Sequence, residues 1–484
     1  MRIIGAALLF PLLLAAQMPQ QIAGHLTADA LKADVSFLAS DALQGRGTPS
    51  PGLDIAAEFI ASQFRRSGLE PAGDDGYFQT AQYKNVTPSA EPVVLTTNDA
   101  KANPAMISVQ DPVALDLTEV AITRATADIA TLTAFTVDQV RGRAMVLDLP
   151  APAQTAGGGR GGAMAVFRLL PILTKLKPAA ILILSATPGI TTRIARLRDA
   201  SADVTPVITV WDPDFRASLN AKPAGLSIHI PAPTEAPVKL RNVLGALRGS
   251  DPRLKDTYLL LTAHYDHLGV RENSPGDDHI FNGANDDASG TASVIEIAHA
   301  LALLPQHPKR TIVFMTQYGE ELGDLGSRYY AQHPVFPLAR TIADINLEQL
   351  GRTDDTRGPQ VGMLNLTGFD YTNIPASLSK AADTVGIRVV NDEKNSGPYF
   401  TRSDNAAFAA AGVPSTTLAV AYDFPDYHKA GDEWPKLDYD NMAKVDLAIA
   451  LAALDLANSD SVPEWNAANP ATARFIKARE EGTK

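Results

Sequence analysis

Short apolar runs alternate with helical segments through the second half of the chain, and this alternation constrains the fold more than any other feature. The strand-like runs cover 258–263, 311–316, 341–345 and 415–420. The clearest helical run between them covers 289–304. Strands that alternate with helices favour a mainly parallel sheet with helices on both faces. We therefore predict an α/β fold from about residue 236.

Between about residues 105 and 235 the pattern changes, because short β-like runs there alternate with turns rich in Pro and Gly. A chain of 484 residues is also long enough for more than one domain. We predict a discontinuous main domain over 24–104 and 236–460 that is interrupted by a β-rich insert over 105–235. A polar segment with little periodicity, 461–484, follows as a C-terminal tail.

The N-terminus has the pattern of a signal peptide. Met1 and Arg2 give a positive start, and the run 3–16 is almost wholly apolar and ends in small residues. This run is too short for a stable membrane anchor, and Pro11 disfavours the alternative of a buried helix. We expect a signal peptide over 1–20, no membrane anchor after its cleavage, and a secreted or periplasmic protein.

Composition narrows the possible chemistry. The formal net charge is -12 and the sequence has no dense Lys/Arg run, so we expect no nucleic-acid partner. The chain has no cysteine, which excludes disulfides, a thiolate nucleophile and a Cys-ligated metal. Any metal must therefore be bound by histidines and carboxylates.

Histidines or carboxylates follow each of the four predicted strands, and further carboxylates lie in a loop that opens a helix. The strands are followed in turn by His264, Asp266 and His267, by Glu320 and Glu321, by Glu348, and by Asp426 and His428, and the loop supplies Asp286 and Asp287. In open α/β sheets, ligands bind beyond the carboxyl ends of the strands, so these side chains should converge. One His with three carboxylates also suits calcium or magnesium, but two His favour zinc or a related transition metal. More than four ligands indicate two ions that share a bridging carboxylate.

Three segments carry a family resemblance: His-Tyr-Asp-His-Leu-Gly at 264–269, Gly-Ala-Asn-Asp-Asp-Ala-Ser-Gly at 283–290, and Glu-Glu-Leu-Gly-Asp-Leu-Gly-Ser at 320–327. Together they resemble the co-catalytic zinc aminopeptidase family, which also includes glutamate carboxypeptidases and glutaminyl cyclases. The resemblance covers most of 236–458 and implies a zinc-peptidase fold for the main domain. The insert over 105–235 is similar to a protease-associated domain.

The resemblance implies two zinc ions per chain, bound by His264, Asp286, Glu321, Glu348 and His428. Asp286 would bridge the ions, Glu321 and His428 would complete the second site, and Asp266 would orient His264 from behind. Glu348 stands where most family members have Asp, so the carboxylate is kept on a side chain that is one methylene longer.

The mechanism implied by the resemblance is hydrolysis of a peptide substrate by a zinc-activated water, with Glu320 as general base. Tyr422 and Tyr427 lie near His428 in sequence and are candidates to donate to the oxyanion, although either could instead be a packing residue. Arg402 is a candidate to bind a substrate carboxylate, with a structural ion pair as its alternative. We assign His267 a role in shaping the site.

The preferred function is a secreted aminopeptidase that acts on peptides. A carboxypeptidase or dipeptidase of the same family is the alternative. A glutaminyl-cyclase-like transferase needs only one zinc, so a full set of ligands for two ions argues against it. A non-catalytic, receptor-like protein is disfavoured because every ligand position is filled and Glu320 is present.

Overall fold

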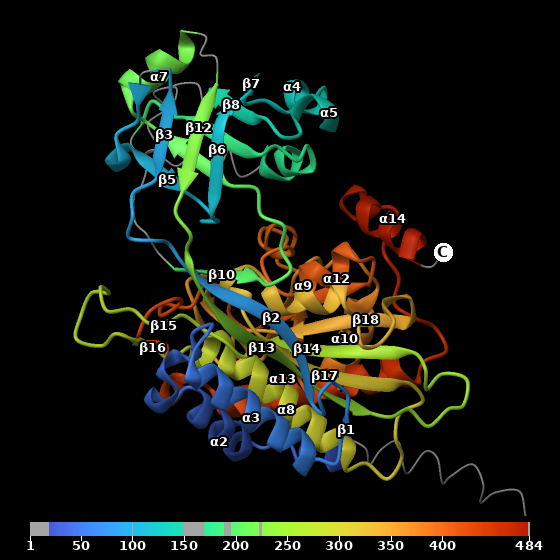
Figure 1. Ribbon diagram of the computed structural model, residues 1–484. Coiled ribbons are helices and arrows are strands. Elements are labelled where there is room, and N and C mark those ends of the chain that lie inside the picture. The colour runs from blue at the N-terminus through green and yellow to red at the C-terminus, as the bar shows by residue number, and fades with distance from the viewer. Residues whose placement is uncertain (1–18, 99, 149–168, 188–194, 222–224, 483–484) are drawn as a thin grey trace, which may run out of the picture. The chain divides into compact units, whose positions relative to one another are not determined.

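Figure 1 shows the computed structural model, which describes residues 19–98, 100–148, 169–187, 195–221 and 225–482. The predicted signal peptide therefore lies outside the described residues, except for its last two positions. The chain divides into two compact units: a large unit of Met1–Ala81 with Leu240–Lys484, and a small unit of Gln82–Lys239. Among the described residues, no helix has both the length and the apolar character needed to cross a bilayer.

The sheet of the large unit has the strand order β2–β13–β17–β14–β18–β23–β21–β22. These strands are β2 Phe78–Thr87, β13 Thr234–Leu247, β14 Tyr258–His264, β17 Thr311–Gln317, β18 Thr341–Leu347, β21 Met363–Leu366, β22 Arg388–Val390 and β23 Ser415–Ala419. The four predicted strands are β14, β17, β18 and β23, and they form the parallel centre of the sheet. β13 and β21 flank this centre in antiparallel pairings. The predicted α/β class with a mainly parallel sheet is confirmed.

Burial explains why these segments form central strands. Every residue of β14, β17 and β18 is buried. A strand covered by helices on both faces reads as a continuous apolar run rather than an alternating one. The apolar runs seen in the sequence are therefore the strands that carry the metal-binding candidates at their carboxyl ends.

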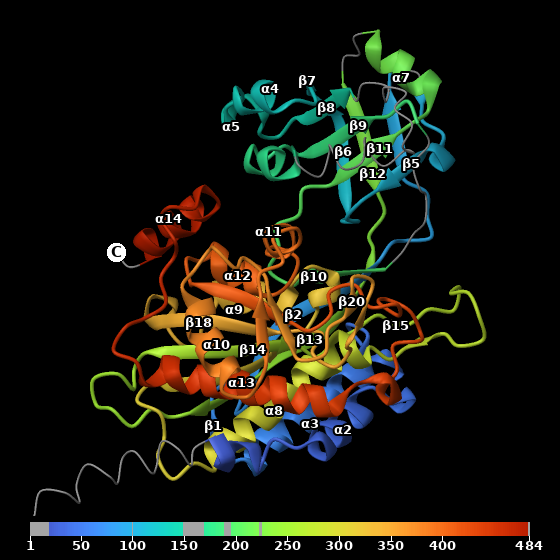
Figure 2. The same ribbon diagram turned by 180° about the vertical axis from the view of Figure 1, so that it is seen from behind.

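Helices cover both faces of this sheet (Figures 1 and 2). One face packs against α8, which contacts β14, β17 and β18 and lies beside α13, α2 and α3. The other face packs against α9 and α12. Their bounds are α2 Ala28–Leu38, α3 Pro51–Arg66, α8 Ser289–Ala302, α9 Leu325–Gln332, α12 Asn405–Ala410 and α13 Tyr439–Asn458. A further helix, α10 Ile374–Asp383, packs against α13 and β22.

Helix α2 shows how local sequence sets these elements. Its side-chain N-cap is Thr27, which accepts a hydrogen bond from the N–H of Ala30 at 3.2 Å. Leu31, Val35 and Leu38 recur at helical spacing and are fully buried. The helix is therefore held to the core by one apolar stripe.

The small unit contains two sheets, with strand orders β5–β11–β9–β8–β7 and β4–β3–β12–β6. Their strands are β3 Val94–Thr97, β4 Ala100–Lys101, β5 Ile107–Val109, β6 Leu115–Val120, β7 Ile122–Thr126, β8 Ala144–Asp148, β9 Ala180–Leu184, β11 Val207–Val210 and β12 Leu226–Ile230. Short helices accompany them at α4 Ile129–Thr133, α5 Val137–Val140 and α7 Pro213–Asn220. The insert was predicted to start at 105. The small unit begins at Gln82 and includes β3, which pairs with β12.

The C-terminal segment is more ordered than its low periodicity indicated. It contains helix α14, Ala473–Gly482. Phe475 is 3% exposed and packs with Phe400 and Trp465. Arg479 also ties the helix to the carbonyls of Leu338 and Thr341. Phe475 is the one buried residue of this helix, and one apolar position is too weak a pattern to read from the sequence.

Candidate metal centre

Parallel strands bring the predicted site residues to one edge of the sheet. His264 is the last residue of β14, Glu348 follows the end of β18, and Glu320 and Glu321 follow β17 after a two-residue turn. Asp286 lies in the turn of helix just before α8. His428 lies in the loop after β23 and has a positive φ of 54°.

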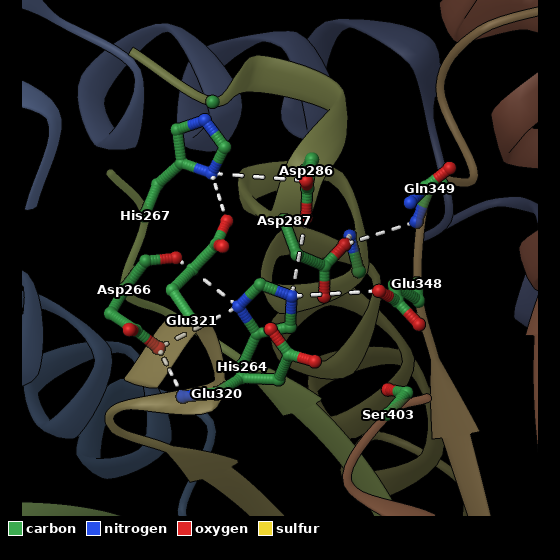
Figure 3. Close-up of polar contacts among 12 residues, drawn as sticks. His264, Asp266, His267, Asp286, Asp287, Glu320, Glu321, Glu348, Gln349 and Ser403 are labelled. Carbon is green, nitrogen blue, oxygen red and sulfur yellow. Dashed lines mark hydrogen bonds and ion pairs between the residues drawn. The ribbon is translucent and has the colours of Figure 1, made fainter. Parts of the chain in front are cut away.

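His264, Asp286 and Glu348 form a first group of candidate ligands (Figure 3). Nε2 of His264 lies 3.3 Å from Oδ1 of Asp286 and 3.8 Å from Oε1 of Glu348. On the other side of the ring, Nδ1 donates to the backbone carbonyl of Asp266 at 3.2 Å. This hydrogen bond leaves Nε2 as the nitrogen available to a metal.

A second group surrounds the other oxygen of Asp286. Nε2 of His428 lies 3.2 Å from Oδ2 of Asp286 and 3.3 Å from Oε1 of Glu321. Nδ1 of His267 lies 2.8 Å from the same Glu321 oxygen and 3.9 Å from Oδ2 of Asp286. Asp286 thus belongs to both groups and offers one oxygen to each, which is the placement that a bridging carboxylate requires.

The spacing and the unpaired atoms of the two groups both fit zinc. Tetrahedral zinc with ligand distances of about 2.0–2.1 Å places its ligand atoms about 3.3–3.4 Å from one another. The distances from His264 to Asp286, from His428 to Asp286 and from His428 to Glu321 are 3.3, 3.2 and 3.3 Å, close to that value. Several converging buried atoms also make no hydrogen bond within the described chain. These atoms are Nε2 of His264, Nδ1 of His267, Oδ2 of Asp286 and Oε1 of Glu321.

The electrostatics of the centre reflect crowding of opposite charges. Burial raises the pKa of Asp286, but the imidazoles of His264 and His428 outweigh it and hold that pKa well below its usual range. Burial lowers the pKa of His428, but Asp286 and Glu321 overcome this and raise it to about 9. Glu320 differs, because burial raises its pKa well above the usual range and the neighbouring Glu348 adds to the effect.

Comparison with known proteins gives a family match for part of the large unit. Residues 242–453 match the model of peptidase family M28. This segment contains all five predicted zinc ligands and Glu320. The large unit, which contains this matched segment, is called the M28 unit below.

Two curated relatives show the range of the family. The chain is 32% identical over 208 residues to a probable zinc metalloprotease of Pyrenophora tritici-repentis, covering 42% of this chain and 44% of that protein. It is 28% identical over 244 residues to the probable glutamate carboxypeptidase VP8 of Zea mays, covering 46% of this chain and 32% of that protein. The chain thus spans less than half the length of either relative.

A solved structure shares the fold. The aminopeptidase from Aneurinibacillus sp. strain AM-1 aligns with 92% of this chain and 97% of its own, with a TM-score of 0.52 and 19% identity. At this identity the likeness concerns the fold alone.

In the M28 unit, Asp266 connects His264 to Glu320. Its backbone carbonyl accepts from the His264 ring, and its Oδ1 accepts from the N–H of Glu320 at 3.1 Å. Its Oδ2 accepts from the hydroxyl of Thr48 at 3.1 Å. The sequence placed Asp266 behind His264, and the structure shows that it also fixes the backbone of the candidate base.

Two further carboxylates, Asp432 and Asp287, position the ligand loops, although neither was assigned a role from the sequence. Asp432 accepts from the N–H groups of Asn285 and Asp286 at 3.0–3.1 Å. Asp287 accepts from the N–H of Gln349, the residue after Glu348, at 3.1 Å. Asp287 follows Asp286 in sequence and Asp432 comes four residues after His428, but their hydrogen bonds join segments that are far apart along the chain.

Arg46 is the largest charged side chain that sequence reasoning missed. It is fully buried and donates to the backbone carbonyls of Leu38, Tyr265, Asn282 and Gly283. Two of these carbonyls belong to the segment that precedes Asp286, and a third lies between His264 and Asp266. In the sequence, Arg46 appears only as part of a polar loop, so nothing local indicates these contacts.

The predicted substrate-binding residues lie at different depths. The ring of Tyr427 stacks on His428 with centroids 4.0 Å apart, and burial together with Asp286 raises its pKa. Tyr422 is 8% exposed and its hydroxyl makes no hydrogen bond within the described chain. Arg402 is exposed and lies over the ring of Tyr399, 4.6 Å from its centroid. Tyr399 in turn contacts the ring of Tyr422 edge-on, so the ring of Tyr399 lies between Arg402 and Tyr422.

Proposed function

We propose that this protein is a zinc-dependent exopeptidase that removes N-terminal residues from peptides. The observation that carries the proposal is the pair of ligand groups that share Asp286, with their unpaired nitrogens and oxygens turned toward each other. Two ions held here, one by His264, Asp286 and Glu348 and one by Asp286, Glu321 and His428, would supply Lewis acidity that lowers the pKa of a bound water.

Glu320 would act as the general base and then as the acid that protonates the leaving amine. Its backbone is fixed by Asp266, and its burial raises its pKa toward the range in which it can both take and give a proton. Tyr427, stacked on His428 beside the carboxylates, is the better placed of the two tyrosines to donate to a developing oxyanion.

The charge around the centre favours an aminopeptidase over a carboxypeptidase. The negative charge of Glu348 lies close enough to Glu320 to raise its pKa. Two neighbouring carboxylates of this kind attract the free ammonium group of a peptide N-terminus. Arg357, which lies over the Tyr422 ring, is paired with Asp355 and Asp392. A carboxypeptidase or dipeptidase remains the second candidate for two reasons. Arg402 is exposed beside the ring of Tyr399, and one curated relative is named a probable glutamate carboxypeptidase.

An assay of the purified protein separates these candidates. Aminoacyl-nitroanilides report on removal of N-terminal residues, and N-blocked peptides with a free C-terminus report on carboxypeptidase action. We expect cleavage of the nitroanilides and its loss on treatment with a chelator. Cleavage of blocked peptides only would favour the carboxypeptidase, and activity that resists the chelator would refute a zinc peptidase.

Glu320→Gln tests the base directly. The variant should keep two zinc ions per chain, because Glu320 is not a ligand in either group, while turnover falls at least about 100-fold. Glu91→Gln, an exposed substitution in the small unit, serves as the control and should leave turnover unchanged. Near-normal hydrolysis by Glu320→Gln would remove this residue from the role.

We also propose export through the N-terminal signal peptide and a protease-associated character for the small unit. The first is supported by the positive start and the apolar run over 3–16, and the second by the resemblance of the insert. N-terminal sequencing of the protein recovered from a periplasmic or extracellular fraction tests export. A mature chain that still begins at Met1 would contradict it.

A further inference from the structure

We propose that His267 is a third imidazole ligand of the metal centre, so that the second ion is held by Asp286, Glu321, His428 and His267. This inference rests on the proposed two-metal function and goes beyond the five ligands that the family resemblance implies. The second ion would then have two imidazole ligands, His267 and His428, instead of His428 alone.

Distance is the first reason. Nδ1 of His267 lies 2.8 Å from Oε1 of Glu321, and His428 approaches the same oxygen to 3.3 Å. Both imidazoles also face Oδ2 of Asp286, at 3.9 and 3.2 Å. Two nitrogens and two oxygens thus surround one point, and the two distances from His267 lie on either side of the roughly 3.3–3.4 Å expected between zinc ligands.

Burial is the second reason. His267 is 1% exposed, and neither ring nitrogen makes a hydrogen bond within the described chain. A buried polar group without a partner costs about 1–3 kcal/mol. Coordination through Nδ1 supplies the missing partner for that nitrogen, and it does the same for the unpaired oxygens of Asp286 and Glu321.

The third reason is that the backbone is shaped to seat the ring. Gly283 has a φ of +57°, and a Cβ built there would lie 2.4 Å from Cγ and 2.5 Å from Cδ2 of His267. The N–H of His267 also donates to the carbonyl of Arg46 at 3.3 Å. The other side of the ring meets the ring of His428 edge-on, with centroids 5.7 Å apart. The imidazole is therefore fixed in place by its neighbours, as a ligand must be.

The two ions would consequently be held unequally. The first would have one imidazole and two carboxylates, and the second two imidazoles and two carboxylates. With one protein ligand fewer, the first ion keeps an open position for water or substrate, as catalytic zinc sites do. We expect a chelator to remove the first ion well before the second.

A simpler role for His267 is to donate from Nδ1 to Glu321 and orient it. His267→Asn separates the two roles, because an Asn amide can donate from nearly the same place but is a poor zinc ligand. His307→Asn, which changes an exposed histidine outside the site, is the matched control. Apo-protein is loaded with two equivalents of Co²⁺, which substitutes for zinc and shifts the NMR signals of coordinated imidazoles.

We expect three solvent-exchangeable, paramagnetically shifted imidazole N–H signals in the wild type, two in His267→Asn and three in His307→Asn. We also expect His267→Asn to bind the tighter of its two ions at least about tenfold more weakly than the wild type. If His267→Asn fails to fold, the wild-type count still decides. Two signals from a wild type that binds two ions would overturn the role of His267 and leave the proposed function intact. A wild type that binds fewer than two ions would overturn the two-metal proposal itself.

Discussion

Replacing Arg46 by Met should destabilise the M28 unit more than any exposed ion-pair substitution. The guanidinium is fully buried and donates to four backbone carbonyls that belong to three separate segments. Burial lowers its pKa to about 10, with Asp266 and Asp287 opposing the shift, so it stays charged at neutral pH. Met fills a similar volume but offers no donor.

The expected loss follows from these contacts. A buried carbonyl left without a donor costs at least about 1 kcal/mol. The Gly283 carbonyl keeps the N–H of Ala288 as a donor, so the other three carbonyls give about 3 kcal/mol. Arg248→Met is the control: Arg248 pairs with Glu70, both side chains are about half exposed, and its loss should cost less than about 1 kcal/mol.

Urea unfolding followed by tryptophan fluorescence measures this difference. The chain has three tryptophans, of which Trp211 lies in the small unit and Trp434 and Trp465 in the M28 unit. All proteins in the comparison carry Trp211→Phe, so that the fluorescence signal reports on the M28 unit. All samples are measured with a chelator in the buffer, so that metal binding does not contribute to stability. An Arg46→Met protein within about 1 kcal/mol of its parent would refute the reasoning, because it would show that those carbonyls find other donors.

Two further predictions test the helix layer and the loop beside the metal centre. Burial raises the pKa of Asp34 to about 8 from an ordinary value of 3.8, so the folded state keeps a proton that the unfolded state releases over that interval. The unfolding free energy of the wild type should therefore fall as pH rises from about 4 to about 8. The unfolding free energy of Asp34→Asn should fall less over the same range. Urea titrations at pH 5 and 8 that show the same fall in both proteins would contradict this. Gly283→Ala should destabilise the M28 unit by more than Gly76→Ala in the same assay, because both glycines have positive φ but only a Cβ at 283 meets other atoms. Equal costs would show that the loop yields to the added methyl group.

Much of the centre could be predicted from the sequence because parallel strands end at one edge of their sheet. His264 ends β14, Glu321 follows β17 and Glu348 follows β18, so strand order alone makes them converge. The apolar runs that identify these strands are continuous because helices bury both faces. Fold class and the ligand candidates therefore came from local pattern.

Other features depended on contacts between distant segments. His267 was assigned only a role in shaping the site, because nothing in a His-x-Asp-His run shows which ring will face Glu321. The insert was predicted to start at 105, whereas the small unit starts at Gln82 and includes β3, which pairs with a strand far away along the chain.

The sequence by itself determined which residues are candidates to bind metal and which strands most of them follow, since both come from residue type and short-range periodicity. Only the tertiary structure decided how the ligands are divided around the two oxygens of Asp286, and that Arg46 and Asp432 hold the loops that present them. The physical reason is that a buried polar group must find its partner in space, and that partner can lie anywhere along the chain.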